Sequence, residues 1–224
     1  MTKDSELIYE KLLDEIITLK IKPGSRLREV DVAEEFKVSR TPIRDVFKKL
    51  EDDGLLEIKS QRGTYVSKID LADISDYMYI RDKVEYAVLK ELTRTISLAE
   101  IADLKMVLHS QTKELEDFNA DNRETARKFF DIDNYFHEYI YKKANRLGVL
   151  KRLNESNPCF TRYRFLTFLR EENEIENLCH IHYAIVDCLE NKDLEALRKV
   201  VMEHNFSGIR GIELVKSKHP TYFN

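Results

Sequence analysis

Four side chains in the C-terminal two thirds of the chain have the types and the spacing of a metal site. Asp133 and His137 are four residues apart, so in a helix their side chains emerge from one face, one turn apart. His182 and His204 lie on two successive predicted helices, on either side of a turn at 191–193. They are roughly 12 and 17 Å from that bend, so an antiparallel hairpin brings them to nearly the same height. One carboxylate and three imidazoles suit Zn²⁺, Ni²⁺, Mn²⁺ or Fe²⁺.

The spacing of these residues leaves a second interpretation open. An isolated histidine in a helix is usually a surface residue or a hydrogen-bonded core residue, and we interpret His109, His180 and His219 in this way. His180 is two residues from His182 and therefore faces elsewhere on its helix. Spacing alone supports a metal site and a set of structural side chains about equally.

A second group of side chains, within Ser39-Arg40-Thr41-Pro42-Ile43-Arg44, has the chemistry of DNA recognition. Arg40 and Arg44 are four residues apart and share one face of a helix. An arginine can donate two hydrogen bonds to O6 and N7 of guanine, whereas the hydroxyls of Ser39 and Thr41 suit phosphate oxygens. The alternative interpretation is a solvated basic face that is paired with nearby aspartates, namely Asp45, Asp52 and Asp53.

The elements that position this basic run have the order of a winged helix-turn-helix. Apolar periodicity and turn residues predict a helix that ends before Pro23-Gly24, helices at about 29–36 and 41–54, and strands at about 55–58 and 63–66. The tip between the strands, Gln61-Arg62-Gly63, could enter a minor groove next to the one that the third helix reads. The order predicts a DNA-binding domain over residues 1–69.

Residues 70–224 carry helical patterns alone, without strand alternation or an internal repeat. The predicted segments are approximately 71–95, 98–118, 122–144, 146–155, 158–170, 172–190 and 193–216. They predict an all-α antiparallel bundle of six or seven helices. The predicted fold class is therefore mainly α, with a winged helix-turn-helix followed by this bundle.

Charge is distributed unevenly along the chain, whose net charge is −4. Residues 1–69 carry 14 Lys and Arg against 14 Asp and Glu, and residues 70–224 carry 23 against 27. Within the neutral first part, the segment from Lys37 to Lys49 holds five cations against Asp45 alone. Because binding to phosphates depends on local positive charge, the acidic total does not exclude DNA binding.

Cysteine usage and hydropathy point to the cytoplasm. The three cysteines, Cys159, Cys179 and Cys188, form no Cys-x-x-Cys pair and are expected to be buried reduced thiols. No apolar run approaches the roughly 20 residues needed to cross a bilayer. The first residues are polar where a secretory signal would be basic and then apolar. We therefore expect no membrane partner.

Four segments closely resemble the DNA-binding domain of the GntR family: Pro23-Gly24-Ser25-Arg26-Leu27-Arg28-Glu29, Val38-Ser39-Arg40-Thr41-Pro42-Ile43-Arg44-Asp45-Val46, Leu50-Glu51-Asp52-Asp53-Gly54-Leu55 and Arg62-Gly63-Thr64-Tyr65-Val66. The resemblance implies that Arg40, Thr41 and Arg44 contact the operator, with help from Gly63 in the wing. The full predicted set of DNA-binding residues is Arg26, Ser39, Arg40, Thr41, Arg44, Arg62 and Gly63. Lys37 departs from the family, because many members have glycine there; if its backbone must be left-handed, lysine costs about 1 kcal/mol.

The surroundings of the four candidate ligands resemble the FCD domain, the all-helical partner of FadR-type GntR regulators. The matching segments are Ile80-Arg81-Asp82-Lys83-Val84-Glu85, Asp133-Asn134-Tyr135-Phe136-His137, His182-Tyr183-Ala184-Ile185-Val186-Asp187 and Met202-Glu203-His204. The resemblance implies that Asp133, His137, His182 and His204 bind a divalent transition metal, which helps to hold a small carboxylate effector. It also suggests Arg81 as a partner of the effector carboxylate. A salt bridge from Arg81 to Glu85, one turn away, is an equally compatible interpretation.

These features predict a homodimeric transcription regulator that is not an enzyme. Two recognition helices related by a two-fold axis would read a pseudo-palindromic operator on double-stranded DNA. A small carboxylate effector held at the metal would change operator affinity. Two alternatives are a helical metalloenzyme with a DNA-binding appendage and a metal-free regulator that responds to an acyl thioester.

Overall fold

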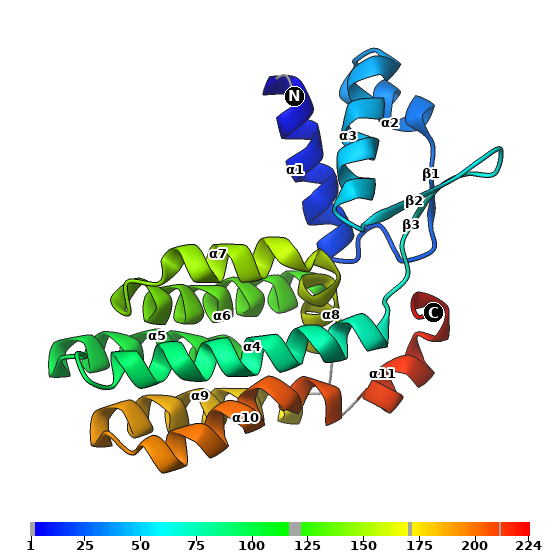
Figure 1. Cartoon of the computed structure of the whole chain (residues 1–224). Helices are drawn as coiled ribbons and strands as arrows, with labels where there is room; N and C mark the ends of the chain where they lie inside the picture. The colour runs from blue at the N-terminus through cyan, green and yellow to red at the C-terminus, as the bar shows by residue number, and fades with distance from the viewer. Residues whose placement is uncertain (1–2, 117–121, 170–171, 211) are drawn as a thin grey trace.

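The structure, a computed structural model, describes residues 3–116, 122–169, 172–210 and 212–224 and is mainly helical (Figure 1). The N-terminal elements are α1 (Lys3–Ile17), β1 (Arg26–Leu27), α2 (Glu29–Phe36), α3 (Arg40–Asp52), β2 (Leu56–Lys59) and β3 (Gly63–Val66). The later elements are α4 (Leu71–Leu92), α5 (Leu98–Glu116), α6 (Arg123–Lys143), α7 (Leu147–Ser156), α8 (Pro158–Phe168), α9 (Glu172–Asn191), α10 (Leu194–Arg210), α11 (Ile212–Lys218) and the 3₁₀ turn η1 (Pro220–Tyr222). The predicted fold class is confirmed.

The three strands form one small antiparallel sheet in the order β1-β3-β2. Strands β2 and β3 agree with the predicted hairpin, with Leu56 opposite Val66 and Lys59 opposite Gly63. Strand β1 was not predicted, because a strand of two residues is too short to show alternation. The hairpin projects away from the helices at the upper right of Figure 1, as a wing does.

Helix α3 has a buried face and a basic exposed face. Its apolar residues Val46, Phe47 and Leu50 are almost fully buried in a core shared with α1 and α2. Burial of this stripe fixes the rotation of α3, since turning it would expose three large apolar side chains at a cost of about 1.5–3 kcal/mol each. The arginines on the opposite side are therefore held at the surface.

Five helices of the C-terminal part pack in a closed ring. Around the ring α4 contacts α10, α10 contacts α9, α9 contacts α5, α5 contacts α6, and α6 returns to α4. Helix α8 packs against α6 and α4 and closes one end of the ring. This ring builds the functional site, because each of its five helices can point a side chain at the same interior.

The boundaries of the described helices follow the predicted ones closely, and the predicted ends at 118 and 170 lie outside the described residues. Side chains of Asp70 and Asn122 cap α4 and α6 by accepting hydrogen bonds from backbone amides of their first turns. The last predicted segment, 193–216, spans α10 and part of α11, on either side of residue 211, which also lies outside the described residues. None of the described helices combines the length and the hydropathy of a membrane span.

The C-terminal part holds the backbone of residues 67–69, which connect β3 to α4. Fully buried Arg162 of α8 donates to the carbonyl oxygens of Ser67 (2.7 Å) and Lys68 (3.2 Å). The amide of Ile69 donates to the carbonyl of Tyr222 at 2.8 Å, and the amide of Asn224 donates to the carbonyl of Ile69 at 3.2 Å. Residues 222–224 and helix α8 therefore both hydrogen-bond to the linker, residues 67–69.

Candidate nucleic-acid interface and metal centre

Arg40 and Arg44 of α3 are held side by side by one carboxylate. Nη2 of Arg40 donates to Oε2 of Glu29 at 2.9 Å, and Nε of Arg44 donates to the same oxygen at 3.0 Å. More than half of each arginine side chain remains exposed. The neighbouring aspartates pair instead with lysines, Asp52 with Lys48 and Asp53 with Lys49.

The hydroxyl-bearing residues at the start of α3 are also exposed. Ser39 is the N-cap residue of the helix, but its side chain makes no capping hydrogen bond. Thr41 lies in the first turn and is exposed as well. Because neither hydroxyl is needed to cap the helix, both can donate to phosphate oxygens, as the sequence predicts.

The side chain of Arg26, on β1, lies across Gly63 at the start of β3 in the wing. The backbone of Gly63 has φ +111°, and a Cβ atom built there would lie 2.9 Å from Nε of Arg26. A larger residue would therefore push the Arg26 guanidinium away, besides straining the backbone. Arg62 is exposed at the adjoining tip. Glycine at this position keeps Arg26 packed against the hairpin.

Lys37 ends α2 in the left-handed conformation, with φ 56° and ψ 41°. Its amide donates to the carbonyl oxygen of Glu34 at 3.2 Å, and the next amide, of Val38, donates to Ala33 at 3.0 Å. This is the geometry for which glycine is favoured. The chain folds in the expected way with lysine in that position.

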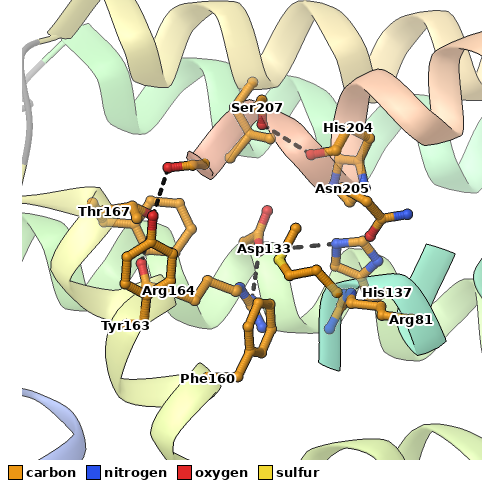
Figure 2. A pocket seen from close by; sticks show the side chains of 14 residues that line it. Arg81, Asp133, His137, Phe160, Tyr163, Arg164, Thr167, His204, Asn205 and Ser207 are labelled. Atoms are coloured by element: carbon orange, nitrogen blue, oxygen red, sulfur yellow. Dashed lines mark hydrogen bonds and ion pairs between the residues drawn. The ribbon is translucent and has the colours of Figure 1, made fainter. Parts of the chain in front are cut away.

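The four predicted metal ligands lie buried together inside the helical ring, and Figure 2 shows three of them, Asp133, His137 and His204. Asp133 and His137 come from α6, His182 from α9 and His204 from α10. Nε2 of His182 is 3.0 Å from Nε2 of His204 and 3.5 Å from Oδ1 of Asp133. Nε2 of His137 is 4.0 Å from Oδ2 of Asp133. One ring nitrogen from each of the three histidines lies within 4.8 Å of the others, and all three side chains are buried.

Hydrogen bonding assigns the protonated nitrogen of His182. Gln111 of α5 donates from Nε2 to Oδ1 of Asp133 at 3.3 Å, which leaves its Oε1 as an acceptor 3.0 Å from Nδ1 of His182. The neutral imidazole of His182 therefore carries its hydrogen on Nδ1 and a lone pair on Nε2. That lone pair faces Nε2 of His204.

Glu85 of α4 lies against the Nδ1 atoms of the other two histidines, His137 and His204. Its Oε1 lies 3.3 Å from Nδ1 of His137 and 3.6 Å from Nδ1 of His204. These are ion-pair distances without hydrogen-bond geometry, but a carboxylate there still favours hydrogens on both Nδ1 atoms, which leaves the Nε2 lone pairs of His182 and His204 facing each other at 3.0 Å. Lone pairs that converge without a cation repel, whereas histidine ligands of metals commonly have this outer partner. The residues present fit a divalent metal ion.

Two arginines complete the charge of the site. Nη2 of Arg164, on α8, lies 2.5 Å from Oδ2 of Asp133, and Nε of Arg81, on α4, lies 3.3 Å from Oε2 of Glu85. The salt bridge expected as an alternative role for Arg81 is therefore present. Arg81 also lines the pocket described below.

Burial and charge shift the pKa values of these groups. Burial holds the pKa of His182 well below its ordinary value and lowers that of His204 to about 4. Burial alone would raise the pKa of Asp133, but the positive charge of Arg164 more than offsets it and the net shift is downward. The pKa of Glu85 is likewise lowered despite its burial. At neutral pH His182 and His204 are thus neutral and both carboxylates are ionised, the forms that bind metals.

A pocket of about 470 Å³, its mouth included, lies beside the four side chains. Asp133, His137, His204 and the two arginines form its polar end (Figure 2). Its other walls are mostly apolar and aromatic, from Met78, Phe160, Tyr163, Phe168 and Leu178. A polar end with an apolar remainder suits a small ligand that carries an acidic group.

Sequence reasoning left out three residues of this site. The sequence indicates Glu85 only as a partner of Arg81, does not decide between pocket and surface for Arg164, and gives no signal for Gln111. Arg81 and Glu85 at i and i+4 were a detectable pair, but no local pattern connects Gln111 or Arg164 to residues 22 to 71 positions away.

Comparisons with known proteins agree with both parts of the structure. Residues 4–66 match the family of bacterial regulatory proteins called gntR, and residues 76–206 match the FCD domain. The HTH-type transcriptional repressor RspR of Escherichia coli is 27% identical over 220 residues, covering 98% of this chain and 93% of the repressor. The gluconate operon transcriptional repressor of Bacillus licheniformis is 26% identical, covering 88% and 79%.

The fold is also found among solved structures. A GntR-type transcriptional regulator from Rhodococcus sp. RHA1 superimposes with a TM-score of 0.71 at 20% identity. The alignment covers 97% of this chain and all of that one.

Proposed function

The chain belongs to the GntR family of bacterial regulatory proteins, as a DNA-binding transcription regulator with an FCD domain, and from this premise we propose that a metal centre controls its DNA binding. It is a regulator and not an enzyme, like the families and relatives that it matches. In our proposal a small carboxylate effector bound beside the metal changes the affinity of the chain for its operator.

The approach of one ring nitrogen from each of three buried histidines to within 4.8 Å of the others carries the metal proposal. Asp133, His137, His182 and His204 would hold a divalent ion, and Glu85 and Gln111 would fix the histidine ring orientations. The ion would supply a Lewis-acidic site to which a carboxylate oxygen can bind. This arrangement favours a metal-dependent regulator over the metal-free alternative that responds to an acyl thioester.

The pocket supports a small carboxylate as the effector. Arg81 lies at its polar end, and guanidinium groups pair well with carboxylates. One relative is named for a gluconate operon, and gluconate is a small carboxylate.

At the DNA, we propose that α3 enters the major groove with Arg40, Thr41 and Arg44 toward the bases. Ser39 would contact a phosphate, while Arg26, Arg62 and Gly63 would present the wing to the neighbouring groove. A homodimer would place two such helices on a pseudo-palindromic operator. We expect the cytoplasm as the site of action, because the DNA is there.

Metal analysis combined with DNA binding tests the proposal. The purified full chain, dialysed against Zn²⁺, should retain about one metal ion per chain, and His182→Ala should lose it. Fluorescence anisotropy on genomic fragments should find a specific operator whose binding is lost in Arg44→Ala. Arg94→Ala, which removes an exposed arginine far from α3, is the matched control. A chain without metal, or without any preferred fragment, would contradict the proposal.

A further inference from the structure

Three ionised side chains, Arg81, Asp133 and Arg164, line the polar end of the pocket, and a fourth, Glu85, lies buried behind it against Arg81. Arg81 is paired with Glu85 and Arg164 with Asp133, and at most 14% of any of these side chains is exposed. The remaining lining residues among those that the structure describes are uncharged or are the histidines of the metal centre. Before a metal binds, two guanidinium groups therefore balance two carboxylates.

Both carboxylates are already engaged by these arginines and by other side chains. Glu85 lies against Nδ1 of two histidines, and Asp133 accepts a hydrogen bond from Gln111. A divalent cation held by neutral imidazoles would add two positive charges that no described side chain of the site balances. Uncompensated charge in a buried site is costly. A ligand with two negative charges restores neutrality, whereas a monoanion leaves one positive charge.

Arg81 provides a place for the ligand. Its Nη1 atom is buried and has no hydrogen-bond partner among the described residues. An unsatisfied buried donor is unfavourable, so an anionic oxygen in the pocket would relieve it. Arg81 lines the same polar end as Asp133, His137 and His204, and one compact anion can reach both the guanidinium and the metal position.

The rest of the pocket limits where the second negative charge can lie. Its hydroxyl groups are turned to backbone oxygens, Tyr163 to Gly208, Thr167 to Arg164 and Ser207 to His204. The apolar lining residues Phe168 and Leu178 offer no donor, and Asn205, whose Nδ2 also donates to the carbonyl of Val201, lies beside His204 at the polar end (Figure 2). Both charges must therefore lie close together at the polar end.

We infer that the pocket selects a compact dicarboxylate, with its two carboxylates one or two carbons apart, over a monocarboxylate. The inference rests on the proposed function, because it takes the divalent metal as part of the site. It goes further by naming the charge and the shape of the effector.

Calorimetry on the Zn²⁺-loaded full chain tests this, with malonate, acetate and inorganic phosphate as probes at equal ionic strength. We expect malonate to bind at least about tenfold more tightly than acetate, which corresponds to about 1.4 kcal/mol. Because malonate also chelates free metal better than acetate, the decisive quantity is how the malonate-to-acetate ratio changes in Arg81→Gln. Removal of that positive charge should lower the ratio about tenfold.

Three variants keep the result interpretable. Arg81→Lys retains the charge and should retain most of the preference. Lys83→Gln removes a positive charge from the exposed side of the same helix and should leave the ratio unchanged. Should Arg81→Gln fail to fold, Arg81→Met removes the same positive charge: a lowered malonate-to-acetate ratio in that variant supports the inference, and an unchanged ratio overturns it.

The outcomes separate this inference from the proposed function. A chain that binds no Zn²⁺ overturns both. A chain that binds Zn²⁺ but takes acetate as tightly as malonate, or keeps the same ratio in Arg81→Gln, overturns the dicarboxylate alone. Tighter binding of phosphate than of malonate also overturns it and assigns the pocket to a phosphate-bearing ligand.

Discussion

Two glutamates, Glu29 and Glu85, each organise a pair of side chains from other parts of the molecule. Glu29 aligns Arg40 and Arg44 at the surface, and the buried Glu85 faces the Nδ1 atoms of two histidines. In both places one carboxylate sets the direction of two functional groups. Removal of either acid should change how those groups act while leaving them in the protein.

Glu29→Gln should raise the affinity for non-specific duplex DNA by several-fold, because it frees both arginines of α3 for phosphates. Glu34→Gln removes an equal charge from the exposed surface of the same helix and is the control. Anisotropy titrations at several salt concentrations would measure the difference. Equal gains in the two variants would show that only net charge matters.

The buried histidines should make the stability of the metal-free chain depend on pH. Burial lowers the pKa of His204 to about 4 and holds that of His182 well below its ordinary value, whereas an unfolded histidine titrates at about 6.5. The unfolded state therefore binds more protons below about pH 6.5. The contribution of these histidines to the free energy of unfolding is fully present above that pH. It falls as the pH drops toward 4, by up to about 1.4 kcal/mol per pH unit for each histidine.

Urea unfolding of EDTA-treated protein between pH 7 and pH 4.5 would measure this loss. His204→Gln should reduce the slope of stability against pH, and His109→Gln, at an exposed position, should not. Zn²⁺ should restore stability most strongly at the upper end of the range, where protons compete least for the ligands. A slope unaffected by His204→Gln would falsify this account.

At the scale of elements, the residues that end helices set the direction of the next helix, both in the helix-turn-helix and at the metal site. Helix α2 stops at Lys37, whose left-handed backbone redirects the chain into α3. A second lysine, Lys192, takes the same conformation between α9 and α10, the helices that bring His182 and His204 together. In both turns a lysine takes the positive φ angle that glycine adopts more easily, at a cost in conformational energy.

Lys37→Gly should therefore stabilise the chain by up to about 1 kcal/mol, because glycine adopts a positive φ without a steric penalty. Lys192→Gly should have a similar effect for the same reason. Lys90→Gly, inside α4, should instead destabilise by about 1 kcal/mol. Denaturant midpoints of the three variants would measure these effects, and destabilisation by Lys37→Gly would contradict the expectation.

At the scale of the whole molecule, helix α8 faces both the sensing site and the linker. Its Arg164 contacts the metal-site carboxylate Asp133, while Arg162 holds the carbonyls of Ser67 and Lys68. Packing between α1 and α8 and an ion pair between Arg127 and Asp14 add further contacts between the two parts. A shift of α8 would therefore move the hydrogen bonds that hold residues 67–69, where the DNA-binding part is attached.

Arg162→Met should loosen this attachment, because two backbone carbonyls lose their donor and a buried unsatisfied acceptor costs about 1–3 kcal/mol. Hydrogen–deuterium exchange should become faster in peptides that contain residues 67–69. Arg152→Met, at an exposed arginine of α7, is the control. Unchanged exchange in Arg162→Met would mean that the chain end holds the linker without α8.

The sequence by itself determined the fold class, the order of the DNA-binding elements and the approximate helix boundaries. These depend on periodicity, caps and turn residues within a few positions of one another, whereas a left-handed backbone at Lys37 was raised only as a condition, through the glycine that the resembled family has there. The spacing of the four candidate ligands indicated a site because Asp133 and His137 share one helix face. His182 and His204 lie at similar distances from the turn that joins their two helices.

Only the tertiary structure decided which side chains surround those ligands. Glu85, Gln111 and Arg164 reach them from three different helices, and Arg162 meets the linker from 94 or 95 positions along the chain. Such contacts depend on how the helices of the ring pack and rotate against one another. Packing of this kind is set by the whole core at once, so no local pattern contains it.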